Sequence, residues 1–156
     1  MRKPRRSSIE AKFLQLSVRA ATWLGAELLD RYCEGASLQD FRIDEFSDHL
    51  RSVVISTDIP GWDESFRSLE VSGIYSDGLP SGLEDVGSLF RIVEAVHEIS
   101  MSQIYGAWQP TVVAQFLIEA QRLAEIEVDP VQLAAALTHD PGENGWGSPL
   151  ATLPSW

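Results

Sequence analysis

Glu94 and His97 have the spacing in this sequence that most suggests chemistry. They begin and end the segment Glu94-Ala95-Val96-His97, and on a helix an E-x-x-H sequence brings a carboxylate and an imidazole to one face. In a helical bundle such a pair can help to hold a transition metal. Glu27 and Glu119 lie in largely apolar surroundings on other predicted helices and are candidates for the single-carboxylate ligands. A metal-binding helical-bundle enzyme is therefore one hypothesis for this chain.

A two-metal site of this kind needs a second E-x-x-H sequence, and the second copy is missing. Phe46 stands three residues before His49, and Ala136 stands three residues before His139. The lone pair is also explained by a helix-face ion pair or by a histidine of the core. We therefore expect no metal and no cofactor, and we keep the four residues above as an alternative.

Other catalytic signatures are missing from the sequence as well. It contains no G-x-S-x-G element, no G-x-G-x-x-G loop and no Walker-type lysine. The glycines from Gly73 to Gly87 are accompanied by Glu84 and Asp85, which would oppose a phosphate. We predict that the chain is not an enzyme.

Three pairs of adjacent acids could suggest acid-base catalysis, which needs two carboxylates in different environments. Adjacent residues on a helix point in different directions, so these pairs do not supply that arrangement. Each pair lies near a predicted helix start, where negative charge is favourable against the helix dipole. We interpret all three as helix-start residues: Asp44-Glu45, Asp63-Glu64 and Glu84-Asp85.

The charge is distributed unevenly along the chain. The sequence has 12 basic and 23 acidic residues, for a formal net charge of -11. Four of the basic residues fall within the first six positions, so the remaining 150 residues carry 8 basic and 23 acidic side chains, or -15. From Ile92 onward Arg122 is the single basic residue. Such a body repels phosphate backbones and predicts no direct nucleic-acid binding, whereas it would attract a basic protein surface. Acidity that serves only solubility is the competing explanation.

The single cysteine and the lack of an export signal favour the cytoplasm. Cys33 rules out an internal disulfide, and its apolar neighbours predict a small buried side chain. No stretch resembles a membrane span, because charged residues interrupt the apolar sequence after the basic N-terminal residues. We expect a cytoplasmic protein without membrane contact.

The hydrophobic periodicity predicts helices along most of the chain. One long helix is expected from Ser8 to Cys33, after a possible capping sequence that begins at Ser7. Further helices are expected from Asp44, between Trp62 and Gly73, from Val86 to about Ile104, from Pro110, and from Pro130 after Asp129. The run Val53-Val54-Ile55 could also form a short strand.

These elements predict an all-α fold, an irregular bundle of five to six helices. We expect a flexible basic arm at residues 1–7, a helical domain at 8–140 and an extended tail at 141–156 that contains glycine, proline and tryptophan. Trp146 and Trp156 are expected to anchor the tail on the body, since an exposed tryptophan loses hydrophobic stabilisation.

The leading hypothesis for function is a small acidic protein that binds a basic protein partner, as inhibitors and immunity-type proteins do. Aromatic residues ringed by polar groups are typical of interfaces. The segment that best fits this description consists of Asp58, Trp62, Asp63, Glu64, Tyr75, Asp77, Glu84 and Asp85. The spacing of Trp62 with Phe66 and Leu69 also fits a core position.

A structural subunit that self-associates through a helical face is a further alternative. The sequence leaves the oligomeric state and the identity of the partner open.

Overall fold

The structure is a computed structural model and describes residues 8–156. The regular secondary structure of these residues is helical. The long helices are α2 (Val18–Gly35), α3 (Phe41–Ser52), α5 (Leu89–Ile104) and α6 (Pro110–Ala124). The short ones are α1 (Ser8–Phe13), α4 (Ile59–Ser65) and α7 (Pro130–Ala136), with 3-10 helices η1 (Phe66–Ser68) and η2 (Glu70–Tyr75) after α4. No strand occurs within residues 8–156, so the predicted all-α fold is confirmed. The basic arm expected at residues 1–7, including Ser7, lies outside the described residues.

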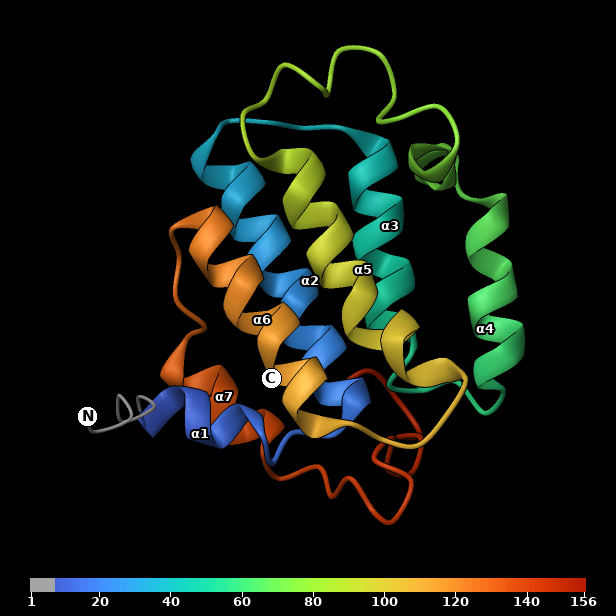
Figure 1. The fold of residues 1–156 in the computed structure, drawn as a ribbon, viewed down its shortest axis with the longest axis vertical. Helices are drawn as coiled ribbons and strands as arrows, with labels where there is room; N and C mark the ends of the chain where they lie inside the picture. The colour runs from blue at the N-terminus through green and yellow to red at the C-terminus, as the bar shows by residue number, and fades with distance from the viewer. Residues whose placement is uncertain (1–7) are drawn as a thin grey trace, which may run out of the picture.

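Helix α2 occupies the centre of the bundle and contacts α3, α5, α6 and α7. Twelve of its 18 residues are buried, which is the pattern of a helix surrounded by others. Figure 1 shows α5 and α6 side by side and antiparallel, with α1, α7 and the tail at one end of the bundle and the loop 76–88 at the other. None of the helices described is long and apolar enough to cross a membrane.

The long first helix expected from Ser8 to Cys33 is interrupted, so this prediction was wrong in its continuity. α1 ends at Phe13, and α2 starts after Ser17, whose hydroxyl accepts a hydrogen bond from the Ala20 amide. The Val18 amide donates to the carbonyl of Gly145 in the tail at 2.8 Å. The apolar pattern runs through the break because residues on both sides of it are buried, so periodicity alone could not reveal it.

Two other boundaries differ from the predictions. The capping residue of α3 lies four positions earlier than expected, because Asp40 rather than Asp44 accepts a hydrogen bond, from the Arg42 amide. The run Val53-Val54-Ile55 forms turns and not a strand. Pro60 lies in the first turn of α4, where proline is compatible with a helix, and Asp58 caps that turn.

The later helices agree well with the sequence. Pro110 and Pro130 each lie in a first helical turn, as predicted. Asp129 caps α7 by accepting from the amides of Val131 and Gln132. Cys33 is buried, and burial followed by the charge of Asp30 raises the pKa of its thiol to about 11, so it is an unreactive core side chain.

The tail is bonded to the body along its length. The Leu150 amide donates to the Val54 carbonyl at 2.7 Å. The ring of Trp156 meets the ring of Trp23 edge-to-face, with centroids 5.8 Å apart. Residues 141–156 therefore cover the end of the bundle at which α2 begins.

Replacing Gly25 with leucine is expected to lower the free energy of unfolding by about 1–3 kcal/mol. Gly25 lies where α2 crosses α5, and a Cβ there would come within 2.9 Å of Ile99 Cδ1 and 3.3 Å of Val96 Cβ. The matched control is Gly35→Leu, because a Cβ at Gly35 meets nothing within 4 Å. Equal destabilisation of the two variants in urea titrations would contradict close packing at this crossing.

Candidate functional site

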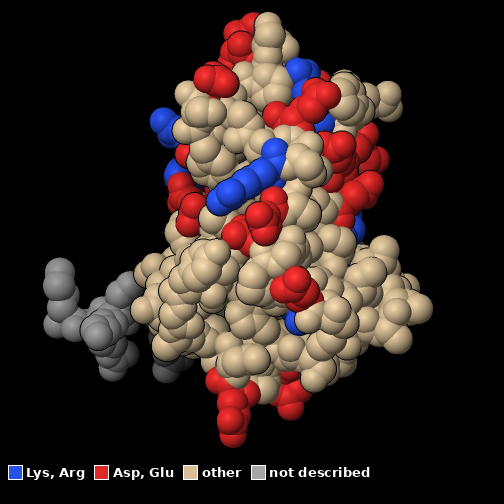
Figure 2. All heavy atoms as spheres, turned by 90° about the vertical axis from the view of Figure 1, so that its right-hand side faces the viewer, with Lys and Arg blue, Asp and Glu red and all other residues tan. Residues whose placement is uncertain are grey.

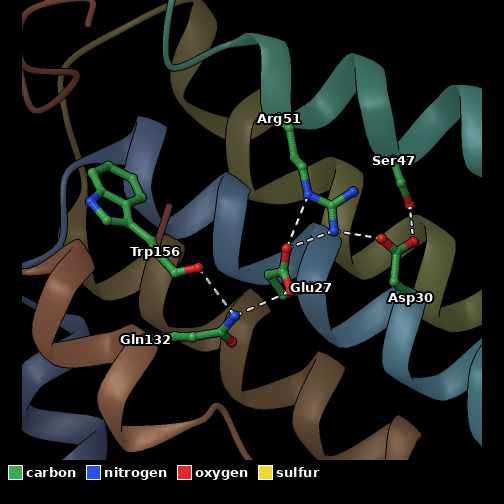
Figure 3. A network of polar contacts seen from close by, with 6 residues as sticks. All are labelled: Glu27, Asp30, Ser47, Arg51, Gln132 and Trp156. Carbon is green, nitrogen blue, oxygen red and sulfur yellow. Dashed lines mark hydrogen bonds and ion pairs between the residues drawn. The ribbon is translucent and has the colours of Figure 1, made fainter. Parts of the chain in front are cut away.

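The structure places Glu27, one of the alternative metal ligands, in an ion-pair network between α2 and α3 (Figure 3). Arg51 binds Glu27 at 2.7 Å and Asp30 at 2.5 Å, and Ser47 donates to the second oxygen of Asp30 at 2.7 Å. The amide of Gln132 donates to Glu27 at 3.2 Å. The lone pairs of Glu27 are therefore engaged by a cation and an amide, as in a structural network.

The other alternative ligands lie in separate settings. Glu119 forms an ion pair with Arg122 at 2.5 Å on α6. His97 is 1% exposed, and its Nδ1 is hydrogen-bonded to the hydroxyl of Tyr75. Residues 8–156 contain no group of three or more His, Cys, Asp or Glu side chains that could hold a metal ion. The E-x-x-H spacing puts Glu94 and His97 on one helix, but the third and fourth ligands are not brought to them.

A Ser17–His139 pair was not anticipated from the sequence, because the two residues are 122 positions apart. Nε2 of His139 faces the Ser148 carbonyl at 2.7 Å and must donate to it, so Nδ1 accepts from the Ser17 hydroxyl at 2.6 Å. The same hydroxyl accepts from the Ala20 amide and is fully buried. This serine has no access to a substrate, and the pair instead joins the start of α2 to the tail.

Two buried histidines form an aromatic cluster with the segment that follows α3. The ring of His49 stacks on that of Trp62, with centroids 4.5 Å apart and an interplanar angle of 6°. Phe66 lies 4.2 Å from His97 and 5.9 Å from His49. The indole N–H of Trp62 donates to the His49 carbonyl at 2.9 Å. Trp62 is 7% exposed, so it serves the core and is not available as an exposed interface anchor.

The remaining residues of the predicted interface are spread over α4, η2 and the loop 76–88. Tyr75 and the acids of the loop are exposed, whereas Asp63 is half-buried. Asp77 and Glu84 line a hollow of about 530 Å³ together with Glu70. Figure 2, which views the molecule from the side of α4, shows acidic side chains concentrated toward the upper part of this face, while the lower part is largely neutral.

A second acidic surface, which the sequence analysis did not single out as an interface, lies in a groove between α5 and α6. Its volume is about 460 Å³. Ala95, Phe116 and Leu123 supply its apolar lining, and its charged lining consists of Arg91, Glu94, Glu98 and Glu119. The lining of the groove thus combines an aromatic ring with three carboxylates and one guanidinium, a composition that suits the binding of a cationic side chain.

Glu94 and Glu98 are the distinctive pair of this groove. They are one helical turn apart on α5 and half-buried, and within the described chain neither carboxylate has an ion pair or a hydrogen bond. Burial, and then the neighbouring charge of Glu94, raises the pKa of Glu98. Like charges at this spacing destabilise a helix by a few tenths of a kcal/mol. The fold therefore keeps two carboxylates without an ion pair in a groove whose lining contains one cation, Arg91.

No family model matches this chain, and neither a curated protein nor a solved structure matches it. The function therefore has to be inferred from the chain's own geometry.

Tyr75 of the predicted interface is coupled electrostatically to the groove. The pKa of its hydroxyl is raised by burial and then by the charges of Glu98 and Glu94. The sequence did contain a signal for the groove, namely two glutamates four residues apart with no basic residue within a turn on their C-terminal side. What it could not show is that Phe116 from the next helix would lie beside them.

Proposed function

We propose that this chain is a small helical binding protein that engages a basic protein partner, in the manner of an inhibitor or immunity-type protein. The observation that carries the proposal is the unpaired Glu94–Glu98 pair in the groove beside Phe116. A lysine or arginine of a partner would neutralise the two carboxylates and pack its aliphatic part and its charge on the ring.

Binding of a cation would relieve a repulsion that destabilises the free protein. In the free protein the Glu94–Glu98 repulsion is unrelieved, so neutralisation by a partner adds to the binding free energy. The surrounding body, with 8 basic and 23 acidic side chains after residue 6, adds a long-range field that accelerates encounter with a basic surface. The acidic residues of α4 and of the loop 76–88 add further negative charge on the side of Tyr75. They belong to the interface predicted from the sequence.

Self-association through the groove is disfavoured by the same charges. Two copies related by a twofold axis would bring Glu94 and Glu98 of one copy against the acidic rim of the other. A partner of opposite charge has no such penalty. The cytoplasmic location is likewise part of this proposal, because the buried free thiol of Cys33 suits a reducing compartment.

The test compares two variants with the same change in charge. Glu94→Gln/Glu98→Gln is expected to weaken binding to a basic partner about tenfold or more, because the partner's cation loses both carboxylates. A tenfold rise in Kd corresponds to a loss of about 1.4 kcal/mol of binding free energy. The control is Glu34→Gln/Glu143→Gln, in which both acids are exposed and distant in sequence from the groove. The partner is first captured from native lysate, identified and purified, and its Kd for each variant is then measured by calorimetry.

The groove variant should fold at least as stably as the parent chain, because its like-charge repulsion is gone. Loss of affinity with retained stability separates a binding role from a structural one. Binding should also weaken between roughly 50 and 300 mM salt. Equal Kd values for the two double variants, or a Kd independent of salt, would contradict the proposal.

A further inference from the structure

Residues 59–75, here called the clasp, comprise α4, η1 and η2 and lie on the outside of the bundle. α4 contacts α5, and η2 contacts α3. Figure 1 shows α4 standing to one side of the four long helices. One short connection joins it to α3, and η1, η2 and then the loop 76–88 lead on to α5. The clasp is therefore a peripheral layer whose attachment depends on the few side chains on its inner face.

The inner side chains of the clasp are apolar: Val71 and Ile74 are buried beside the aromatic ones, and the aromatic ones rest on two histidines. Trp62 stacks on His49, and Phe66 packs against His97 at 4.2 Å and against His49 at 5.9 Å. At the end of the clasp, the hydroxyl of Tyr75 is hydrogen-bonded to Nδ1 of His97. His49 belongs to α3 and His97 to α5, so the two imidazoles join the clasp to both helices beneath it.

The two imidazoles have a setting that suits only their neutral form. His49 is 9% exposed, and its Nε2 is buried with no hydrogen-bond partner in the described chain. Burial lowers the pKa of His49 to about 4. Burial and then the proximity of His49 lower the pKa of His97 to about 4. A proton on either ring would place a charge among Trp62, Phe66 and the other imidazole.

We propose that the clasp is acid-sensitive, and that protonation of His49 and His97 releases residues 59–75 from α3 and α5 while the four long helices stay packed. This regulatory role is separate from the proposed binding function and stands on its own geometry. Release would uncover the apolar inner face of the clasp and break the hydrogen bond between Tyr75 and His97.

The charged groups around the cluster do not compensate for protonation. From the clasp, α4 and η1 contribute the neutral rings of Trp62 and Phe66, and η2 contributes the Tyr75 hydroxyl. On α5, Glu94 and Glu98 act on Tyr75, but neither forms an ion pair with His97. On α3, Arg51 is already bound to Glu27 and Asp30 of α2. The pKa of Asp63 on α4 is raised by burial and is affected by the charges of Arg67 and Glu64, and not by the histidines.

The direction of the pH effect follows from the shifts. Both histidines have a lower pKa in the closed state than the 6.5 of a free imidazole, so the open state binds more protons below neutrality. The closed clasp is fully favoured above about pH 6.5 and loses that advantage as the pH falls toward 4. At pH 4.5 each histidine should shift the equilibrium toward the open state by roughly 10- to 100-fold.

Hydrogen-deuterium exchange of the intact protein at pH 7 and pH 4.5, corrected for intrinsic exchange, tests the proposal. Amides of residues 59–75 should lose protection at least tenfold more than those of α2 and α6. Uniform loss throughout the chain would overturn it, because that indicates global acid unfolding. Undiminished protection of the clasp at pH 4.5 would also overturn it.

The variant His49→Phe provides the link to the imidazole, since a phenyl ring can keep the stacking on Trp62 without taking up a proton. It should reduce the acid-dependent loss of clasp protection about tenfold or more, whereas His139→Gln, which lies outside the cluster, should leave that loss unchanged. If His49→Phe does not fold, ring-proton NMR of the parent chain decides instead. Two histidines that titrate below pH 5 support the proposal, and midpoints near 6.5 for both refute it.

Discussion

Replacing Arg19 with leucine is expected to lower the free energy of unfolding by about 2–4 kcal/mol. The guanidinium is 4% exposed and has no carboxylate partner among the described residues. It is held instead by three backbone carbonyls. It donates to the carbonyls of Val53 and Ser56, which follow the end of α3, and the distance to Ser56 is 2.9 Å. A weaker hydrogen bond of 3.4 Å joins it to the carbonyl of Gly147 in the tail.

Leucine can fill much of the space, but the Ser56 and Gly147 carbonyls lose their donor, whereas the Val53 carbonyl keeps the Ser56 amide at 3.3 Å. A buried polar group without a partner costs about 1–3 kcal/mol, and two carbonyls would be affected. Urea denaturation monitored by circular dichroism measures the loss. Arg19→Lys is the matched control: it keeps the charge but lacks the fork that reaches two acceptors, so it should show an intermediate loss. If leucine were tolerated within about 0.5 kcal/mol, Arg19 could not be the connection between α3 and the tail.

Replacing Gly145 with alanine is expected to destabilise the protein by about 2–4 kcal/mol and to detach the tail. Gly145 has a φ of 82°, which side chains other than glycine rarely adopt, and a Cβ there would overlap the ring of Trp108. Its carbonyl accepts from the first amide of α2, so a shift of this residue also disturbs the start of the central helix.

The control for Gly145→Ala is Gly82→Ala. Gly82 also has a positive φ, of 94°, but a Cβ there meets nothing within 4 Å. It should therefore show the backbone strain alone, about 1 kcal/mol, and the difference between the variants measures the packing against Trp108. Limited proteolysis should cut residues 141–156 faster in the Gly145 variant. Equal stability of the two variants would mean that Trp108 readily moves aside.

The tail and the acidic groove occupy different parts of the molecule, so the tail contributes to stability and not to the proposed binding surface. Trp156 packs on Trp23, and its carbonyl accepts from Gln132 at 3.4 Å beside the Glu27–Arg51 pair (Figure 3). The groove lies between α5 and α6, and the clasp lies against α3 and α5. α5 is thus the element shared by the proposed binding surface and the proposed acid-sensitive layer. A change at His97 can reach Tyr75 and the groove without involving the tail.

Much of the fold could be predicted because local signals and tertiary contacts agree in α5, α6 and α7. In α7 the proline, the capping Asp129 and the apolar spacing point to the same start, in α6 the proline and the spacing do, and in α5 the spacing does. The break before α2 was missed because Ser17 caps a helix in the middle of an apolar pattern. One short helix was expected between Trp62 and Gly73, but the chain there is divided among α4, η1 and η2. Phe66 packs on His97, and the hydroxyl of Tyr75 is hydrogen-bonded to the same ring.

The candidate site was predicted less well than the fold. Acidity, the exposure of Tyr75 and the core position of Trp62, which the spacing also allowed, could be read from residue types. The E-x-x-H sequence suggested a metal, but in the structure Glu94 lines the groove between α5 and α6, and His97 is hydrogen-bonded to Tyr75. Residues three apart on a helix share a face only approximately, and the packing of neighbouring helices decides which of them is buried.

By itself the sequence determined the all-α class, the acidic body and the helix starts at Pro110 and Pro130, because composition, charge and capping are properties of single residues and their near neighbours. The tertiary structure alone decided the groove between α5 and α6, the pairing of Ser17 with His139, and the stacking of His49 on Trp62. Each of these joins residues from segments that are far apart in the sequence or belong to different helices. Their proximity depends on how the helices pack against one another, and that packing is set by the sum of many weak contacts that no local pattern records.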